Sequence, residues 1–444
     1  MRAADTKNGS APLFNIGVLP SIWGIYIAQG VLGGLTFVGL PTILRNQHVS
    51  LGKIGLLSLV MLIWAIKFLW AQPVERLRIA PTGRRHSRKI ILVGEGVTAG
   101  LLCVIAFWPP WLFSGLLMLL LCAAVSATIV DIACDAFLIE QIPENERGKG
   151  NMAQVGGAYI GLVLGGSVFV SLYGALGWQI GCFVMAFTVL SLTAPMFFYN
   201  HENREVFLVR PQELRPGLLN ALRRGEIWCG IVLTMTYEMS GRLVQGLTGP
   251  FLIDQGIPLN TVGVFNGMGG VVAGLCGTVI GGIVVRKAGA KNGMYLIAIC
   301  QAALLAVIFS SIKLQFLHIS ILFALFVCEA ALMAASFVAS YSRLMAFTAP
   351  HQPGIDFTLF QSASAIAAAS LGATGAFLAG KTGYDTVFLI SVVLSLAALC
   401  LIPFINSFQK KNVSESGYDI ILGNVYFKSG LFVQIIRYLF PRWA

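Results

Sequence analysis

The sequence predicts an all-α membrane protein. Of its 444 residues, 57% are hydrophobic and only 11% are charged, whereas a soluble domain carries about 25% charged residues. The apolar residues gather in runs long enough to cross a bilayer, which takes about 20 residues per helix. The positive charge lies in the short loops between these runs. The formal net charge of +11 therefore indicates loops beside a membrane and does not favour nucleic-acid binding.

Twelve apolar runs predict twelve membrane-spanning helices. An even number of spans places both chain termini on the same side of the membrane. The runs cover residues 18–40, 54–73, 90–108, 111–138, 152–175, 179–199, 226–250, 260–284, 293–312, 316–341, 356–380 and 384–406.

The distribution of Lys and Arg predicts which side holds the termini. If both termini are cytoplasmic, 24 of the 30 Lys and Arg residues fall in cytoplasmic segments and 4 fall in outward loops. Cytoplasmic loops of membrane proteins carry this kind of excess. We therefore expect the N- and C-termini to be cytoplasmic.

The longest cytoplasmic connection divides the runs into six plus six. It contains an amphipathic segment, Leu218 to Arg224, of a kind that lies on a membrane surface. Two pseudo-symmetric bundles around a site at the midplane are the layout that such a division favours. The expected parts are an N-terminal six-helix bundle (1–199), a cytoplasmic linker (200–225), a C-terminal six-helix bundle (226–406) and a basic cytoplasmic tail (407–444).

Two carboxylates near the end of the fourth run are functional candidates. A charge at bilayer depth is costly unless it faces a protein interior or a water-filled cavity. Asp131 and Asp135 are four residues apart, so they share one face of a helix. The sequence leaves open proton coupling, contact with a ligand, or an ion pair with the basic loop 83–89. We assign Asp131 to proton coupling and Asp135 to a cytoplasmic gate, together with Arg84, Arg85, Glu146 and Arg147.

Glu238 and Arg242 in the seventh run form a second candidate pair. They are four residues apart with the glutamate first, which is the favourable order for a helical ion pair. The pair is either structural or a switch, in which protonation of Glu238 frees Arg242 to bind an anion. Arginine suits a carboxylate because its fork offers two parallel donors. Glu329 in the tenth run has no evident local partner, and we expect it to share proton coupling with Glu238.

Polar and aromatic residues of several runs complete a candidate substrate site. Lys67 either extends its charge toward the interface or presents it to a cavity. Each polar residue alone is also explained by helix packing, but together they would line a mixed polar and aromatic pocket. Gln154 and Tyr159 are further lining candidates. The predicted substrate-binding residues are Tyr26, Gln29, Lys67, Tyr237, Arg242, Asn266 and Gln361.

The sequence contains no pattern typical of an enzyme or of a metal centre. All nine cysteines lie in apolar runs without a CxxC pair, and the five histidines are scattered. Glycines of the fifth and eighth runs predict close helix packing rather than a nucleotide loop. We expect no catalytic residue, no bound metal and no cofactor. The energy source is then an ion gradient.

Several motifs resemble one group of permeases. Asp131, Asp135, Glu140, Pro143 and the triplet Glu146-Arg147-Gly148 resemble the fourth-helix signature of AmpG-type permeases of the major facilitator superfamily. Lys67 to Trp70, the loop at Gly83-Arg84-Arg85, Tyr237 to Arg242 and Phe326 to Glu329 also resemble that group. The resemblance implies the major facilitator fold. It also implies a monomeric permease of the bacterial inner membrane that moves a small molecule by alternating access, usually with a proton.

Within this group the sequence favours one branch. Muropeptide permeases often have additional C-terminal helices and a lysine near the position of Glu238, whereas this chain has twelve apolar runs and a glutamate. These departures favour siderophore permeases of the RhtX/FptX/YbtX type, which import a siderophore or its metal chelate. The alternative is an anhydromuropeptide permease. A membrane-bound enzyme or a sensor would need a nucleophile, a metal cluster or an output domain that the sequence does not indicate.

Overall fold

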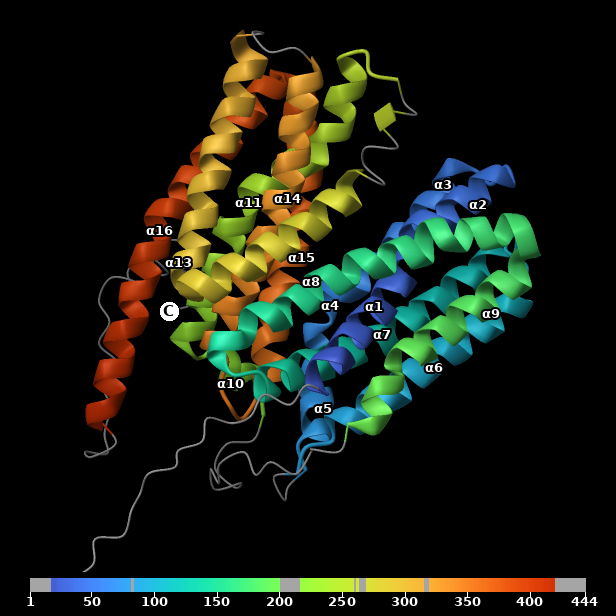
Figure 1. Cartoon of the computed structure of the whole chain (residues 1–444), viewed down its shortest axis with the longest axis horizontal. Coiled ribbons are helices and arrows are strands. Elements are labelled where there is room, and N and C mark those ends of the chain that lie inside the picture. The colour runs from blue at the N-terminus through green and yellow to red at the C-terminus, as the bar shows by residue number, and fades with distance from the viewer. Residues whose placement is uncertain are drawn as a thin grey trace, which may run out of the picture. The chain divides into compact units, whose positions relative to one another are not determined.

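The computed structural model describes residues 17–80, 84–199, 216–258, 261–262, 269–314 and 319–419. Over these residues the chain is almost entirely helical (Figure 1). The helices are α1 (Val18–Gly34), α2 (Leu40–Asn46), α3 (Leu51–Gly55), α4 (Leu59–Ile66), α5 (Phe68–Arg78), α6 (Ser87–Phe107), α7 (Phe113–Gln141), α8 (Arg147–Val163), α9 (Phe169–Phe198), α10 (Leu218–Leu222), α11 (Gly225–Asp254), α13 (Gly270–Leu314), α14 (Ile319–Leu344), α15 (Pro353–Thr382) and α16 (Tyr384–Asp419).

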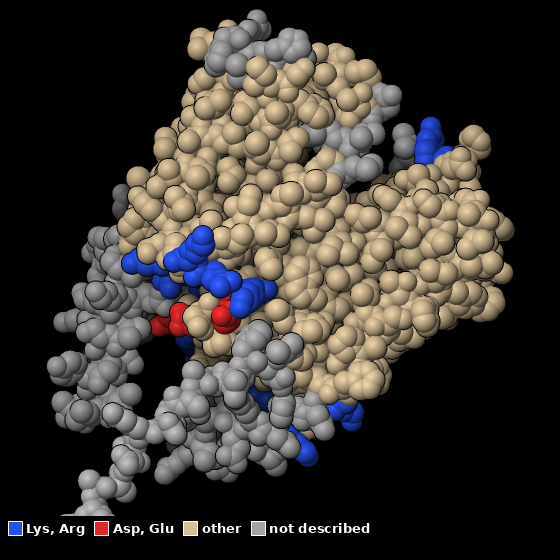
Figure 2. Space-filling model, viewed as in Figure 1, with Lys and Arg blue, Asp and Glu red and all other residues tan. Residues whose placement is uncertain are grey.

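The described residues contain helices of bilayer length. Eight are long and apolar enough to cross a membrane, and a ninth is added when Gly52–Ile66 and Phe68–Arg78 count as one bent span. In the view of Figure 2, most of the described surface carries no charged side chain, and most Lys, Arg, Asp and Glu residues gather toward the lower end. A broad uncharged surface is what contact with lipid tails requires.

Two of the long helices are each two rods joined at a glycine. Gly177 within α9 has φ 83°, and Gly289 within α13 has φ 78°. A residue with a Cβ rarely adopts such a φ, so these glycines allow the chain to reverse without a loop. Each of the twelve predicted runs contains a helix in the described residues, and the eighth run is described only in part. This correspondence counts α9 and α13 as two helices each, takes α4 and α5 as one bent span, and includes α11. The last helix, α16, continues past residue 406 to Asp419 and so extends into the predicted tail.

The packing separates N-terminal from C-terminal helices. In the N-terminal part, α1 packs on α8 and α9, and α6 packs on α7 and α9; in the C-terminal part, α13 packs on α14, and α11 packs on α15. Two helices connect the parts, since α8 packs on α13 and α14, and α15 packs on α4, α5 and α7. The chain divides into a compact unit up to Cys400 and a second unit from Leu401 onward, whose described residues continue α16.

Two π-helical turns lie against each other where α1 meets α8. One, η1, covers Leu35–Gly39 between α1 and α2, and the other, η4, covers Leu164–Val168 between α8 and α9. Glycines allow the backbones to approach closely at this level. A Cβ placed on Gly165 would lie 1.9 Å from the carbonyl oxygen of Val31.

Replacing Gly165 by alanine is expected to destabilise the protein by about 1–3 kcal/mol, because the added methyl group cannot fit without moving a backbone. Gly100 on α6 is the matched control, since a Cβ there meets no atom within 4 Å. Alanine at Gly100 should leave stability unchanged or raise it by up to about 1 kcal/mol. Thermal unfolding of the purified protein in detergent measures both. Equal melting temperatures for the two variants would contradict this account of the contact.

Candidate substrate cavity

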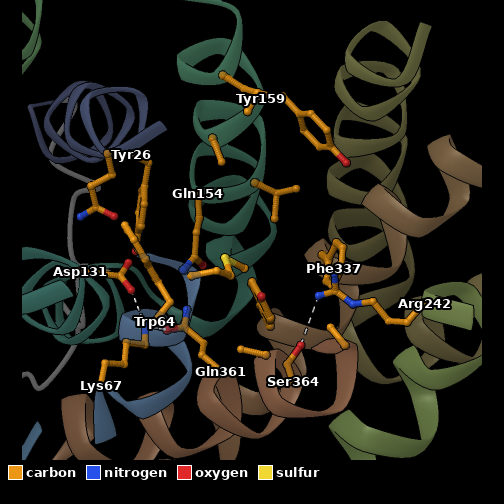
Figure 3. A pocket seen from close by; sticks show the side chains of 18 residues that line it. Tyr26, Trp64, Lys67, Asp131, Gln154, Tyr159, Arg242, Phe337, Gln361 and Ser364 are labelled. Atoms are coloured by element: carbon orange, nitrogen blue, oxygen red, sulfur yellow. Dashed lines mark hydrogen bonds and ion pairs between the residues drawn. The ribbon is translucent and has the colours of Figure 1, made fainter. Parts of the chain in front are cut away.

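A cavity of about 420 Å³ lies between the N-terminal and the C-terminal helices. Its walls are mixed in chemistry, with aromatic rings, three glutamines and three charged side chains. Figure 3 shows Lys67 and Asp131 on one side, Arg242 and Phe337 on the other, and Gln361 and Ser364 between them. The lining residues are Tyr26, Gln29, Met61, Trp64, Lys67, Asp131, Gln154, Val155, Ala158, Tyr159, Leu162, Arg242, Phe337, Tyr341, Gln361, Ser364, Ala365 and Ala368.

Lys67 reaches the cavity because its span bends there. The segments Gly52–Ile66 and Phe68–Arg78 meet at an angle of 52°. Pro73 follows less than two turns later and lacks the N–H that would bond the carbonyl of Leu69. The Lys67 side chain is buried, forms a salt bridge with Asp131 and donates a hydrogen bond to Gln361 on α15. Lys67 therefore joins the N-terminal helices to the C-terminal helices within the cavity wall.

The two carboxylates of α7 have different surroundings. Asp131 lines the cavity and accepts hydrogen bonds from Lys67 and, with the Gln29 amide turned toward it, from Gln29 at 3.1 Å. Asp135 lies one turn further along and is fully buried. Its Oδ1 accepts hydrogen bonds from the Tyr26 hydroxyl at 2.5 Å and from Gln154 Nε2 at 2.8 Å. Neither carboxylate contacts the basic loop at residues 84–86.

Arg242 supplies the second cation. Its guanidinium lies 3.6 Å from Glu238 in the predicted pair and donates to Ser364 at 3.4 Å. The Ser364 hydroxyl in turn donates to Glu238. The guanidinium carbon also lies 4.6 Å from the ring centre of Phe337, a cation–π contact. Arg242 is thus held by one carboxylate and one ring, with part of its fork facing the cavity.

This arrangement suits a polar solute that carries acidic groups. Two cations approach from opposite walls, and each is paired with a carboxylate, so the charges of the cavity wall are balanced. A solute carboxylate gains a charge-assisted hydrogen bond if it displaces the partner of either cation. The glutamines supply donors and acceptors, and the rings of Trp64, Tyr159 and Tyr341 supply flat apolar faces.

Most of the predicted substrate residues meet in this cavity. Tyr26, Gln29, Lys67, Arg242 and Gln361 line it, as does Asp131, a predicted proton-coupling residue. Tyr237 does not, because its hydroxyl donates to the carbonyl of Met294 at 3.2 Å. Asn266 lies outside the described residues.

The other predicted proton-coupling residues lie outside the lining. Glu238 lies behind Arg242, and Glu329 is buried beside Gln301, whose amide nitrogen lies 3.3 Å from its Oε1. Sequence reasoning missed Ser364, Phe337 and Tyr341. Their positions on α14 and α15 indicate only ordinary helix packing.

The predicted contacts of the gate need correction. Asp135 bonds Tyr26 and Gln154, as described above, and Arg84 is exposed. Arg85 instead lies 3.3 Å from Glu140 and donates to the carbonyl of Pro350 at 3.4 Å. Burial lowers the pKa of Arg85, and neighbouring Glu140 opposes that shift. The carboxylate that Arg85 approaches is therefore Glu140, near the end of α7, and not Asp135.

A buried charge cluster lies at the same end of the molecule and was not predicted. Arg78 donates to Glu75 at 2.7 and 2.9 Å and to Glu140 at 2.7 and 2.9 Å. Glu75 also accepts from the backbone N–H of Gly354 at 3.4 Å, in the first turn of α15. The positive end of the α15 dipole stabilises this carboxylate. The cluster joins α5 and α7 to α15.

The two remaining gating candidates form local pairs. Glu146 lies 2.6 Å from Lys149, and Arg147 lies 3.9 Å from Glu144, both within one helical turn. These contacts stay within residues 144–149, at the start of α8, so a gating role for Glu146 and Arg147 remains a prediction.

Helices of bilayer length around a cavity with paired charges are typical of a membrane carrier for small molecules. The family model of the Major Facilitator Superfamily matches residues 22–314 of the sequence. The chain belongs to the Major Facilitator Superfamily, so it is a multi-pass membrane transporter and not an enzyme.

Individual relatives agree with this membership. The chain is 25% identical over 391 residues to the anhydromuropeptide permease of Escherichia coli (strain K12), a match that covers 84% of this chain and 77% of that protein. Among solved structures, a bacterial homologue of the iron transporter ferroportin, in an outward-facing state, is similar with a TM-score of 0.66 at 16% identity over 88% of this chain and 100% of that chain. The fucose:proton symporter of Escherichia coli is similar with a TM-score of 0.66 at 13% identity, over 87% of this chain and 97% of that chain. The predicted all-α membrane fold of the major facilitator type is confirmed, and the cytoplasmic placement of both termini remains a prediction.

Proposed function

We propose that the chain is an inner-membrane permease that imports a muropeptide, an amino sugar bearing a short acidic peptide, by proton-coupled alternating access. The observation that carries this proposal is the pair of cations, Lys67 and Arg242, on opposite walls of one polar and aromatic cavity. The likeness to a protein named anhydromuropeptide permease supports it.

The chemistry of such a solute matches the cavity group by group. The peptide part of a muropeptide carries carboxylates, which suit the fork of Arg242 and the ammonium of Lys67. Its amide groups suit Gln29, Gln154 and Gln361, which present both donors and acceptors. The apolar faces of its sugar rings suit the aromatic residues of the lining.

Import of a siderophore, which the sequence favoured, receives less support. One of its two arguments was Glu238 at a position where muropeptide permeases often carry lysine. Glu238 lies behind Arg242 and Ser364 and does not line the cavity, so it is not placed to choose between substrates. No relative reported above is named as a siderophore permease. Siderophore import therefore becomes the competing outcome of the test below.

The proposed roles follow from the contacts. Arg242 and Lys67 bind the acidic groups of the substrate. Glu238, Glu329 and Asp131 remain the proton-coupling candidates that the sequence suggested. The cluster of Glu75, Arg78 and Glu140, which contacts α15, is proposed to act as a gate at its end of the molecule.

Uptake by spheroplasts tests the proposal. Cells that lack their own muropeptide permease should accumulate labelled anhydromuropeptide when they express this chain, and a protonophore should abolish accumulation. The same spheroplasts should not accumulate a labelled metal–siderophore above the level of the empty vector. Siderophore uptake without muropeptide uptake would reverse the assignment of substrate.

A further inference from the structure

The buried charges around Asp131 and Asp135 do not balance. Lys67 is the cation that the structure places there, and two carboxylates, Asp131 and Asp135, lie one turn apart beside it. Lys67 donates hydrogen bonds to Asp131 and to Gln361, so its charge already compensates Asp131 and is not available to Asp135. If both carboxylates were ionised, this buried group would carry a net negative charge, which is expensive in a low-dielectric interior.

Asp135 is the carboxylate left without a cation. Its Oδ1 accepts from Tyr26 and Gln154, and the amide of Gln361 also approaches the carboxylate. All three partners are uncharged, and Oδ2 is buried without a hydrogen bond of standard geometry among the described residues. The titratable groups that face it are Asp131 and Cys134 on α7, Lys67 at the start of α5, Tyr26 on α1 and Tyr341 on α14. Apart from Lys67, none of these groups is a cation, so a proton on Asp135 is the means of neutralising it.

The other buried acids fit the coupling role less well. Glu238 has Arg242 as a counter-ion and accepts a hydrogen bond from Ser364. Asp131 has Lys67. Glu329 and Glu95 have no cation among the described residues, but neither lines the cavity, and Gln301, the partner of Glu329, does not line it either. Asp135 lies directly behind the lining, because both of its hydrogen-bond donors, Tyr26 and Gln154, are lining residues.

We propose that Asp135 binds the transported proton and that Lys67 controls its release. The proposal rests on the proton-driven transport proposed above. In this structure Asp135 is protonated while Asp131 and Gln361 hold Lys67. When the N-terminal helices separate from α15, Lys67 loses Gln361 and approaches Asp135. The O–H bond of the carboxyl group then breaks, the proton passes to water in the cavity, and the ammonium of Lys67 compensates the carboxylate that remains.

A transport assay separates coupling from movement of the solute. The Asp135→Asn variant keeps an acceptor for Tyr26 but cannot release a proton. It should exchange labelled for unlabelled muropeptide at near wild-type rates, yet should lose accumulation against a gradient, at least tenfold, together with sensitivity to a protonophore. Glu95→Gln is the matched control, since Glu95 is also buried in the membrane but lies outside the cavity lining. Retained accumulation by Asp135→Asn would overturn the proposal.

Infrared spectroscopy tests the proton without any substrate. Purified protein labelled with ¹³C at the aspartate carboxyl group should show one isotope-shifted C=O stretch of a protonated carboxyl that disappears as the pH is raised. Asp135→Asn should remove this band, and Glu95→Gln should keep it. Absence of the band from the wild-type protein would refute the assignment even if the variant does not fold. Failure of muropeptide uptake, with the band present and assigned to Asp135, would overturn the proposed substrate alone.

Discussion

Replacing Lys67 by alanine is expected to destabilise the protein by about 3–5 kcal/mol and to abolish transport. The change removes the counter-ion of Asp131 and leaves a buried charge uncompensated, which costs this much in buried ion pairs. It also removes the hydrogen bond to Gln361, a direct contact between the N-terminal and the C-terminal helices inside the cavity. Thermal unfolding in detergent and spheroplast uptake measure the two effects.

The double variant Lys67→Met with Asp131→Leu separates stability from function. Apolar residues of similar size often replace a buried ion pair at no cost in stability. The double variant should therefore recover most of the lost melting temperature while it remains inactive in uptake. If it transports muropeptide like the wild type, Lys67 does not contact the substrate.

Replacing Arg242 by alanine should lower transport efficiency by about 10- to 100-fold, since hydrogen bonds to charged groups contribute about 1.5–3 kcal/mol. The guanidinium is placed to bind a substrate carboxylate through two parallel donors, and alanine offers none. Initial rates of uptake over a range of substrate concentrations measure this effect.

Two further variants define the role of the Arg242 guanidinium. Arg242→Lys keeps the charge without the planar fork, so its activity should fall between those of alanine and arginine. Lys313→Ala is the control, because Lys313 pairs with Asp385 at an exposed position outside the cavity. It should transport at the wild-type rate. Equal losses in the alanine and lysine variants would show that bidentate geometry is decisive, and no loss in either would exclude Arg242 from the substrate site.

The sequence predicts the helices well because a bilayer leaves the backbone few alternatives. Each span must satisfy its own N–H and C=O groups, so an apolar run of sufficient length is a helix. The sequence predicts a break between residues 175 and 179, but it does not predict that the two helical rods would join at Gly177 without a loop. A single glycine in an apolar run is equally compatible with an uninterrupted helix, and its positive φ is visible only in the structure.

The cavity is predictable to the extent that rare residue types mark it. Lys67, Arg242 and Asp131 stand out because charge at membrane depth is uncommon. Tyr237 was predicted to line the cavity, although helical geometry argues against that position. It precedes Arg242 by five residues, which is about 140° around the helix axis, whereas Glu238 is separated from Arg242 by about 40°. Tyr237 therefore faces α13 when Arg242 faces the cavity.

The gate residues show the limit of reasoning from charge alone. Both Asp135 and Glu140 lie near the end of α7, and the basic loop could have approached either one. Glu140 is reached by Arg78 because Arg78 ends α5 and already holds Glu75 one turn before it. Asp135 is turned away toward Tyr26 on α1. Which carboxylate pairs with the loop depends on helix rotation, and the sequence does not supply that.

The paired π turns change the direction in which the side chains beyond them point. A π turn contains one more residue than an α turn, so side chains beyond it are rotated by about 100° relative to an unbroken helix. Because η1 and η4 lie at the same level, the side chains of both helices are rotated at the same point, and their contacting faces stay matched. Each turn therefore acts as a one-residue insertion compensated by a second insertion in the neighbouring helix. Deletion of one residue from η1 alone would restore regular α geometry there and bring the wrong face of α2 toward α9.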